Sequence, residues 1–149
     1  MKNFCTVFAT VISGVLVYLL GEILKEHWLE PYHQYKKLKG EIAFALVYYA
    51  NYYSNPVILS QASDKEIDKR NSISDELRSL SSRLHATAET RAFIAIGIPE
   101  REKLRKAARY LMGISNGLFT VNDAHFDDNV KSADSVRKTL KIIGEGKEI

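Results

Sequence analysis

The sequence predicts an all-α protein in which an N-terminal transmembrane helix leads into a bundle of about four helices. Residues 4–24 form one apolar run, and the apolar residues after it recur at helical spacing. No segment alternates apolar and polar residues, and no Asn-Gly hairpin pattern appears. We expect four parts: a transmembrane helix at 4–24, a juxtamembrane helical segment at 25–40, a cytoplasmic helical bundle at 41–143 and a mobile tail at 144–149.

The composition fits one ordered domain and excludes several classes of protein. The chain has 149 residues, and its 21 Lys and Arg nearly balance 18 Asp and Glu, which leaves a net charge of +3. A charge balance of this kind is not that of a nucleic-acid-wrapping protein, so we expect no sequence-specific nucleic acid binding. A single cysteine rules out an internal disulfide or a cysteine-rich zinc site.

The apolar run at 4–24 has the length and composition of a membrane span. As a helix it measures about 31 Å, which matches the hydrocarbon thickness of a bilayer. Its only charged residue, Glu22, lies near its end. The competing interpretation is a cleaved signal peptide, but no A-x-A-like cleavage site follows the run. We therefore expect an uncleaved anchor.

Basic and aromatic residues after the run predict the orientation of the span. Only Lys2 and the α-amine precede it, whereas several lysines follow it: Lys25, Lys36, Lys37 and Lys39. The positive-inside rule then places the N-terminus outside and the helical bundle in the cytoplasm, as in a bacterial inner-membrane protein. Trp28, Tyr32 and Tyr35 follow at helical spacing and suit an aromatic belt at the headgroups, with Lys36 and Lys37 beside them. The alternative is that these rings pack inside the helical body.

Small and hydroxyl-bearing residues gather near one face of the predicted span: Thr6, Thr10, Ser13, Gly14 and Gly21. Such residues let helix backbones approach closely, and hydroxyl groups can form hydrogen bonds between helices in lipid. This pattern predicts self-association into a homo-oligomer, in which the same face packs between spans or lines a pore. The alternative is a lone anchor with scattered small residues.

The first half of the bundle contains two predicted helices. Residues 41–53 keep helical spacing, but their unbroken apolar stretch is too short for a second span, and the helix should end near 54–56, at Ser-Asn-Pro. Ser63 and Glu66 match a capping box that opens the next helix. Its buried face carries Ile73, Leu77, Leu80 and Leu84, and we expect it to run to about Ile96.

The second half of the bundle contains two more predicted helices. Pro99 suits the first turn of a helix whose apolar stripe ends near Asn116-Gly117. The last helix should start around Asn122-Asp123 and stop at Gly144. Its early acids and late lysines suit the helix dipole.

The sequence carries no catalytic motif, so we expect no enzyme, no cofactor and no metal. None of the four histidines has another at metal-ligand spacing, and no Gly-rich phosphate loop or nucleophile elbow is present. The densest acid-histidine cluster, residues 123–128, could hold a divalent metal. Its place at a helix start favours capping of backbone N–H groups instead.

Two patterns could hold a ligand on the cytoplasmic side. Arg101, Arg105 and Arg109 recur every four residues, a spacing that can engage phosphates of lipid headgroups or of a nucleotide. Tyrosines 48, 49, 52 and 53 form two i, i+4 pairs that could stack on a base. The plainer interpretations are a solvated helix face for the arginines and core packing for the tyrosines.

Several strings carry a resemblance to known proteins. They are Glu30-Pro31, Gly40-Glu41-Ile42, the stretch from Tyr49 to Pro56, Leu77-Arg78-x-Leu80, Ile98-Pro99 and the stretch from Leu111 to Asn116. Over most of residues 13–120 the chain resembles small bacterial single-span membrane proteins with a helical cytoplasmic body. Proteins of this build are similar to membrane effectors of anti-phage defence. The resemblance implies no catalytic residues.

Together these patterns predict an oligomeric inner-membrane effector that perturbs or permeabilises the membrane. Its partners would be the lipid bilayer, other copies of the chain, and a cytoplasmic sensor protein or nucleotide signal. The alternative is a membrane-tethered adaptor or scaffold that binds a cytoplasmic protein. No sequence feature favours a third class, an immunity-type membrane protein.

Overall fold

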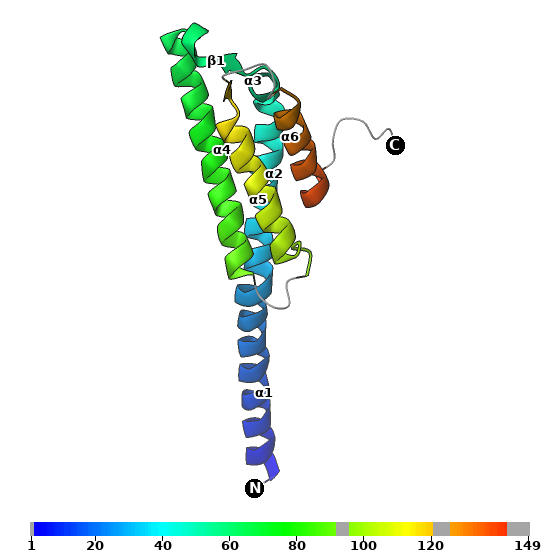
Figure 1. Ribbon diagram of the computed structural model, residues 1–149. Coiled ribbons are helices and arrows are strands. Elements are labelled where there is room, and N and C mark those ends of the chain that lie inside the picture. Colours follow the sequence, from blue (N-terminus) through cyan, green and yellow to red (C-terminus); the bar gives the residue numbers. More distant parts are fainter. Residues whose placement is uncertain (1, 92–95, 121–125, 143–149) are drawn as a thin grey trace.

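The computed structural model describes residues 2–91, 96–120 and 126–142 (Figure 1). The main helices are α1 (Lys2–Leu24), α2 (Glu30–Tyr48), α4 (Asp64–Thr90), α5 (Arg101–Asn116) and α6 (Phe126–Leu140). Shorter elements connect them: a π-helical turn, η1 (Lys25–Leu29), the helix α3 (Ala50–Ser54), the strands β1 (Val57–Ile58) and β2 (Phe119–Thr120), and a 3₁₀ turn, η2 (Leu59–Gln61). The prediction of an all-α protein is confirmed.

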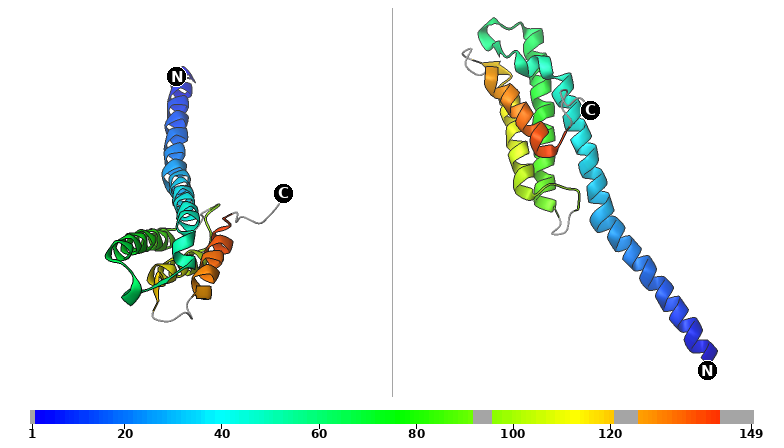
Figure 2. Two further views of the ribbon diagram at one scale, coloured as in Figure 1. Left: turned by 90° about the horizontal axis from the view of Figure 1, so that it is seen from above. Right: turned by 90° about the vertical axis from the view of Figure 1, so that its right-hand side faces the viewer.

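The first 48 residues contain one unbroken helical rod. Leu24 and Glu30, on either side of η1, keep right-handed helical dihedral angles, so the chain passes from α1 through η1 into α2 without a break. From Lys2 to Tyr48 the rod is about 70 Å long. Its α2 half lies in the helical body, whereas its α1 half extends alone away from that body (Figure 2).

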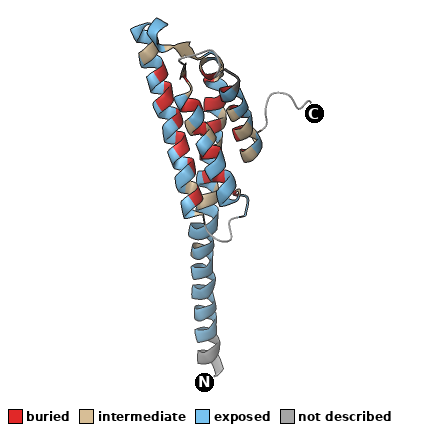
Figure 3. Ribbon diagram, in the orientation of Figure 1, coloured by how far each residue is buried: buried red, intermediate tan, exposed pale blue. Residues whose placement is uncertain are grey.

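The body is a bundle of the four helices α2, α4, α5 and α6. The helix α5 lies between α4 and α6, and α2 contacts both α4 and α6. Each helix of the bundle contributes an apolar stripe to the core, and the buried residues of the described part of the chain lie in the body and not in α1 (Figure 3). They include Ile42 and Leu46 of α2, Leu77 and Leu84 of α4, Leu104 and Leu111 of α5, and Val136 and Leu140 of α6.

The core of the body begins earlier in the chain than the predicted bundle. Tyr35 and Leu38 lie in the predicted juxtamembrane segment at 25–40, but both are buried in the core. The helix then ends where Ser54-Asn55-Pro56 predicts, since α3 stops at Ser54. The body therefore includes the second half of the segment that we expected to link it to the span.

The start and end of α4 differ from the prediction. Ser63 has the extended backbone of an N-cap residue, but its side chain makes no capping hydrogen bond. The capping box does not form, and Glu66 instead lies 3.4 Å from the guanidinium of Arg70. The helix ends at Thr90 rather than near Ile96. Residues 92–95 lie outside the described part of the chain.

The last two helices also begin or end at different residues. The helix α5 begins at Arg101, two residues after Pro99, and ends at Asn116 as expected. The helix α6 ends at Leu140, before the predicted stop at Gly144, because Lys141 takes a left-handed backbone conformation with a φ of 52°. The predicted start at 122–123, part of the acid-histidine cluster and the tail at 144–149 lie outside the described residues.

The strands β1 and β2 were not predicted. They pair in parallel, Val57 with Phe119 and Ile58 with Thr120, at the end of the body opposite to α1. Two residues are too few to produce an alternating pattern in the sequence, which explains why the pairing could not be found there.

Candidate functional site: the apolar rod and its junction with the body

The helix α1 is an apolar surface that nothing in the described chain covers. From Val7 onward its apolar side chains are exposed, and none of its most apolar 18-residue window, with a mean hydropathy of 2.1, is buried. By length and composition the rod is long and apolar enough to cross a membrane. A core helix of similar composition would be buried by its own chain, and α1 is not.

The small-residue face of α1 is open to a partner. Thr10, Gly14 and Gly21 fall within about 40° of one another around the helix axis. A Cβ atom added to Gly14 or Gly21 would have nothing within 4 Å. Ser13 lies at one edge of this face and donates a hydrogen bond to the Thr10 carbonyl at 2.9 Å. Thr6 is in α1, but its side chain lies outside the described part.

Some of the residues predicted to lie at the membrane interface are exposed, and others are buried in the core. Trp28 lies in η1 and is exposed, and Lys36 and Lys37 are exposed on α2. Tyr32 is half-buried beneath Lys36, whose ammonium lies 5.4 Å from the centroid of the ring. Tyr35 is only 4% exposed and packs in the core. Of these three rings, only Trp28 is therefore exposed.

A small pocket lies where the rod meets the body. Its lining comes from η1 and the start of α2, which contribute His27, Trp28 and Gln34, and from the end of α4, which contributes Thr87 and Thr90. Arg91 and Ile98 complete it. Within the described residues, no cluster of His, Cys, Asp and Glu could hold a metal ion here or elsewhere. Polar and aromatic side chains therefore line the junction between the rod and the body.

Two of the three predicted ligand-binding arginines hold the end of α4. Arg101 Nε donates to the Ala88 carbonyl at 2.9 Å, and Arg105 makes a bidentate pair with Glu89 at 2.8 and 3.0 Å. Hydrogen bonding by Arg105 lowers the pKa of the Glu89 carboxyl. Arg109 is exposed and forms no ion pair with the described residues. The row of arginines is therefore mostly engaged within the protein.

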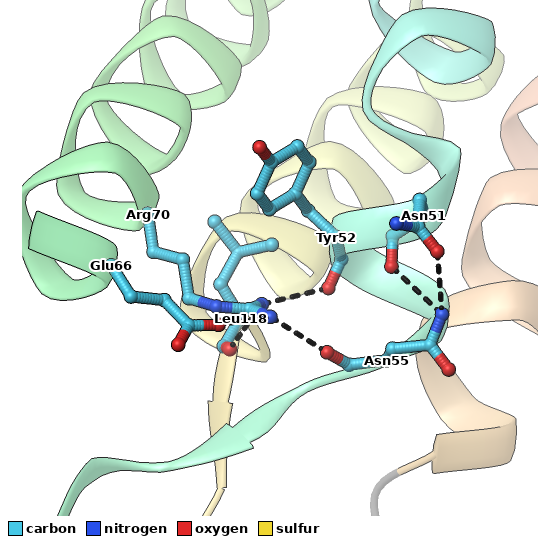
Figure 4. Close-up of polar contacts among 6 residues, drawn as sticks. All are labelled: Asn51, Tyr52, Asn55, Glu66, Arg70 and Leu118. Atoms are coloured by element: carbon cyan, nitrogen blue, oxygen red, sulfur yellow. Dashed lines mark hydrogen bonds and ion pairs between the residues drawn. The ribbon is translucent and has the colours of Figure 1, made fainter. Parts of the chain in front are cut away.

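A buried arginine that the sequence did not reveal connects three segments at the far end of the body (Figure 4). Arg70 of α4 is 4% exposed, and its guanidinium donates to the carbonyls of Tyr52, Leu118 and Asn55 at 2.9, 3.1 and 2.8 Å. It also lies 5.5 Å from the centroid of the Tyr52 ring. Its position three residues before Ile73 is on the buried stripe of α4, and this spacing was the available signal.

Hydroxyl groups also connect α4 to α5. Ser74 Oγ donates to the Ser115 carbonyl at 3.1 Å, and Ser81 Oγ donates to the Ala108 carbonyl at 2.7 Å. The Arg101–Ala88 hydrogen bond continues this series, because each contact is seven residues along both antiparallel helices from the last. Small serines permit the close approach that these hydrogen bonds need.

The tyrosine-rich turn between α2 and α3 serves the core more than a ligand. Tyr53 is buried and donates to the Leu46 carbonyl at 2.7 Å, and Tyr49 is buried and donates to the Glu76 carboxylate. Tyr48 is exposed and stacks on Phe44, with the ring centroids 5.2 Å apart.

The remaining evidence on identity is comparative. Comparisons of the chain with models of protein families, with curated proteins and with solved structures found no match.

Proposed function

We propose that the chain is a single-span protein of the bacterial inner membrane and acts as an oligomeric effector. The helix α1 crosses the membrane, the body lies in the cytoplasm, and a signal or partner bound to the body rearranges the spans so that the membrane leaks. A role in anti-phage defence is the setting that the resemblance favours. The observation that carries the proposal is the unbroken rod from Lys2 to Tyr48, which is exposed and apolar in α1 and packed into the core in α2.

The rod supports a mechanical connection between body and span. Leu38, Ile42 and Leu46 of α2 are fully or almost fully buried among the other helices of the body. Because such a core is close-packed, α2 cannot turn within the body without repacking it. A change in the position of the body therefore moves α1. A signal shifts this equilibrium only as far as it binds the leaking arrangement more tightly than the closed one.

An effector that makes the membrane leak also needs contacts between the spans of several chains, because one helix cannot form a pore. The open space around Gly14 and Gly21 allows close approach of a second backbone, and the Thr10 hydroxyl lies on the same face. We therefore assign span packing or pore lining to the face formed by Thr6, Thr10, Ser13, Gly14 and Gly21.

The test uses the membrane potential of cells that express the full chain together with its genomic neighbours. Triggered expression of the natural sequence is expected to depolarise the cells, as read by a potential-sensitive dye. Gly14→Leu should abolish the depolarisation because its side chain separates the spans. Val15→Leu is the matched control, since it adds bulk about 150° away from the centre of the small-residue face and should still depolarise the cells.

Equal amounts of each variant in the membrane fraction, measured by immunoblot, make the comparison valid. A membrane potential that stays unchanged under the natural sequence overturns the effector proposal. Equal depolarisation by Gly14→Leu and the natural sequence overturns the assignment of the packing face.

A second candidate function, a membrane-tethered adaptor, has one observation in its favour. Phe44, Val47 and Tyr48 of α2 are each about 60% exposed and form an apolar patch on the body. Exposed apolar patches of this kind mark protein interaction sites. Replacing α1 by an unrelated apolar helix discriminates the two functions, because an adaptor keeps its activity with any anchor and the effector loses it.

A further inference from the structure

A basic groove runs along one side of the body, beside the membrane-proximal half of α2. It is open to solvent. Three segments that are far apart in the sequence form it: α2 through Tyr32, Lys36 and Lys39, the loop before α5 through Gly97, and the end of α6 through Lys141. No acidic residue is among the described residues that line it.

The three lysines of the groove, Lys36, Lys39 and Lys141, have no acidic partner within the described part of the chain. Elsewhere arginines are paired with neighbouring acids, as in Arg83–Glu41, Arg105–Glu89 and Arg137–Asp134. Glu41, which follows the groove directly in α2, is thus already engaged by α4. Three unneutralised ammonium groups around one hollow create a positive potential there.

The shape of the groove is fixed by specific backbone contacts. Gly97 has a φ of 82°, and a Cβ at this position would lie 2.6 Å from the Tyr32 ring, so only glycine lets the loop pack this closely on α2. Lys39 Nζ donates to the Lys141 carbonyl at 2.8 Å, which ties α2 to the end of α6. Lys36 lies over the Tyr32 ring. These contacts hold the basic side chains around a preformed hollow.

We propose that this groove binds a phosphate-bearing anion. Ammonium groups bind phosphate oxygens through strong charge-assisted hydrogen bonds, and the groove offers several without a competing carboxylate. The phosphate could belong to a lipid headgroup or to a soluble nucleotide, since both present the same chemistry. The inference rests on the proposed function and deepens it, because the groove lies on α2, the helix that continues into α1. A ligand here acts directly on the rod, whereas Arg101 and Arg105 of the arginine row are engaged by α4.

The experiment measures binding to the folded full chain in a neutral detergent. Isothermal titration calorimetry with inorganic pyrophosphate and with ATP tests the soluble source. Native mass spectrometry with phosphatidylglycerol, against phosphatidylcholine as the neutral lipid, tests the headgroup source. Saturable binding of pyrophosphate or ATP supports a soluble ligand, and selective retention of phosphatidylglycerol alone supports a lipid headgroup.

Variants locate the binding site. Lys36→Gln and Lys141→Gln should each weaken the binding about tenfold, the usual effect of losing one charge-assisted hydrogen bond. Lys69→Gln is the matched control, because it removes the same charge from an exposed position near the other end of the body, in the first turns of α4. Circular dichroism confirms that each variant folds. Lys36 is the cleaner test, because Lys39 also holds the end of α6.

Two outcomes overturn the inference: no saturable binding of pyrophosphate, ATP or phosphatidylglycerol, or a loss in Lys69→Gln as large as that in Lys36→Gln. Because the measurement needs no membrane potential, its failure leaves the effector proposal standing. Equally, a protein that binds the anion but never depolarises cells contradicts only the effector proposal.

Discussion

Arg70 places a buried positive charge at the far end of the body, where it donates hydrogen bonds to three backbone carbonyls. The carbonyls of Tyr52, Asn55 and Leu118 each accept a hydrogen bond from its guanidinium, and buried carbonyls need such partners. The fork of donors on an arginine can reach all three at once, which a lysine cannot do. Arg70 therefore connects α3, α4 and the end of α5.

Arg70→Met should destabilise the protein by about 3 kcal/mol, because it leaves buried carbonyls without donors. Arg70→Lys should recover part of this loss. The measurement is chemical unfolding of the full chain in neutral detergent. Arg78→Met serves as the control, since Arg78 is exposed, and the loss of its ion pair with Asp75 and its hydrogen bond to Asn116 should together cost about 1 kcal/mol or less. Equal losses in Arg70→Met and Arg78→Met would contradict the role of Arg70.

Gly117 illustrates a position where the neighbour, and not the backbone angle, requires glycine. A Cβ there would lie 2.2 Å from Asn129 Oδ1, and Asn129 is buried with its amide donating to the Tyr53 and Gly117 carbonyls. Gly117→Ala should therefore cost about 2 kcal/mol by displacing Asn129. Gly113→Ala, with open space around its Cβ in the same helix, should stabilise by about 0.5–1 kcal/mol. Thermal unfolding of the two variants gives the comparison.

Tyr49 makes the stability of the body depend on alkaline pH. Its hydrogen bond to Glu76, and then its burial, raise the pKa of the Tyr49 phenol from 10.0 to about 12. Since the fold favours the neutral phenol, this contribution is complete below pH 10 and is lost as the pH rises toward 12. The melting temperature should fall across this range, and it should fall less in Tyr49→Phe. An identical fall in both proteins would show that Tyr49 is not responsible.

At the scale of elements, the apolar spacing predicted the helices, whereas their ends depended on contacts that the spacing does not contain. The stripe from Ile73 to Leu84 marks the buried face of α4 correctly, because burial imposes that period. Ser63 and Glu66 match the sequence pattern of a capping box, but the box does not form, and Glu66 pairs instead with Arg70, one turn further along the same helix. Arg70, Ser74 and Ser81 lie on the same stripe and are buried as well. Their burial could not be predicted from the apolar spacing, because they are polar.

The serine contacts predict how closely α4 and α5 pack. Ser81→Leu should destabilise the protein by about 2–3 kcal/mol, since the larger side chain forces the helices apart and removes the hydrogen bond to Ala108. Ser82→Leu makes the same chemical change on the exposed side of the same turn, and its effect should be about 0.5 kcal/mol or less. Urea unfolding of both variants tests this, and equal effects would contradict close packing at Ser81.

At the scale of the whole molecule, the sequence predicted an apolar N-terminal helix followed by a helical body, and the structure shows both. Composition alone distinguishes residues 4–24 from the rest, which is why this division could be predicted. The basic groove could not be predicted, because residues 36, 97 and 141 meet only after α2, the loop and α6 have packed together. The hydrogen bonds of Arg101 and Arg105 to the end of α4 could not be predicted for the same reason.

The unbroken rod predicts that the rotational phase between body and span matters for function. Two alanines inserted between Leu29 and Glu30 turn the body by about 200° around α1, whereas seven turn it by about 700°, which nearly restores the original phase. Triggered depolarisation should be lost with two inserted residues and retained with seven. Equal activity of both insertions would show that α1 and the body are not rigidly coupled, as expected of a plain tether.

In the proposed arrangement, α1 would also act as a rigid arm that pivots near Leu24, where the exposed apolar helix meets the body. If the body tilts by about 10° against the membrane surface, the outer end of the arm sweeps about 5 Å, given an arm of about 31 Å. Packed helices lie with their axes about 8–10 Å apart, so a sweep of this size is enough to part neighbours that touch at their outer ends. In the proposed membrane arrangement, a small rocking of the body would thus be amplified across the bilayer while every helix keeps its internal structure.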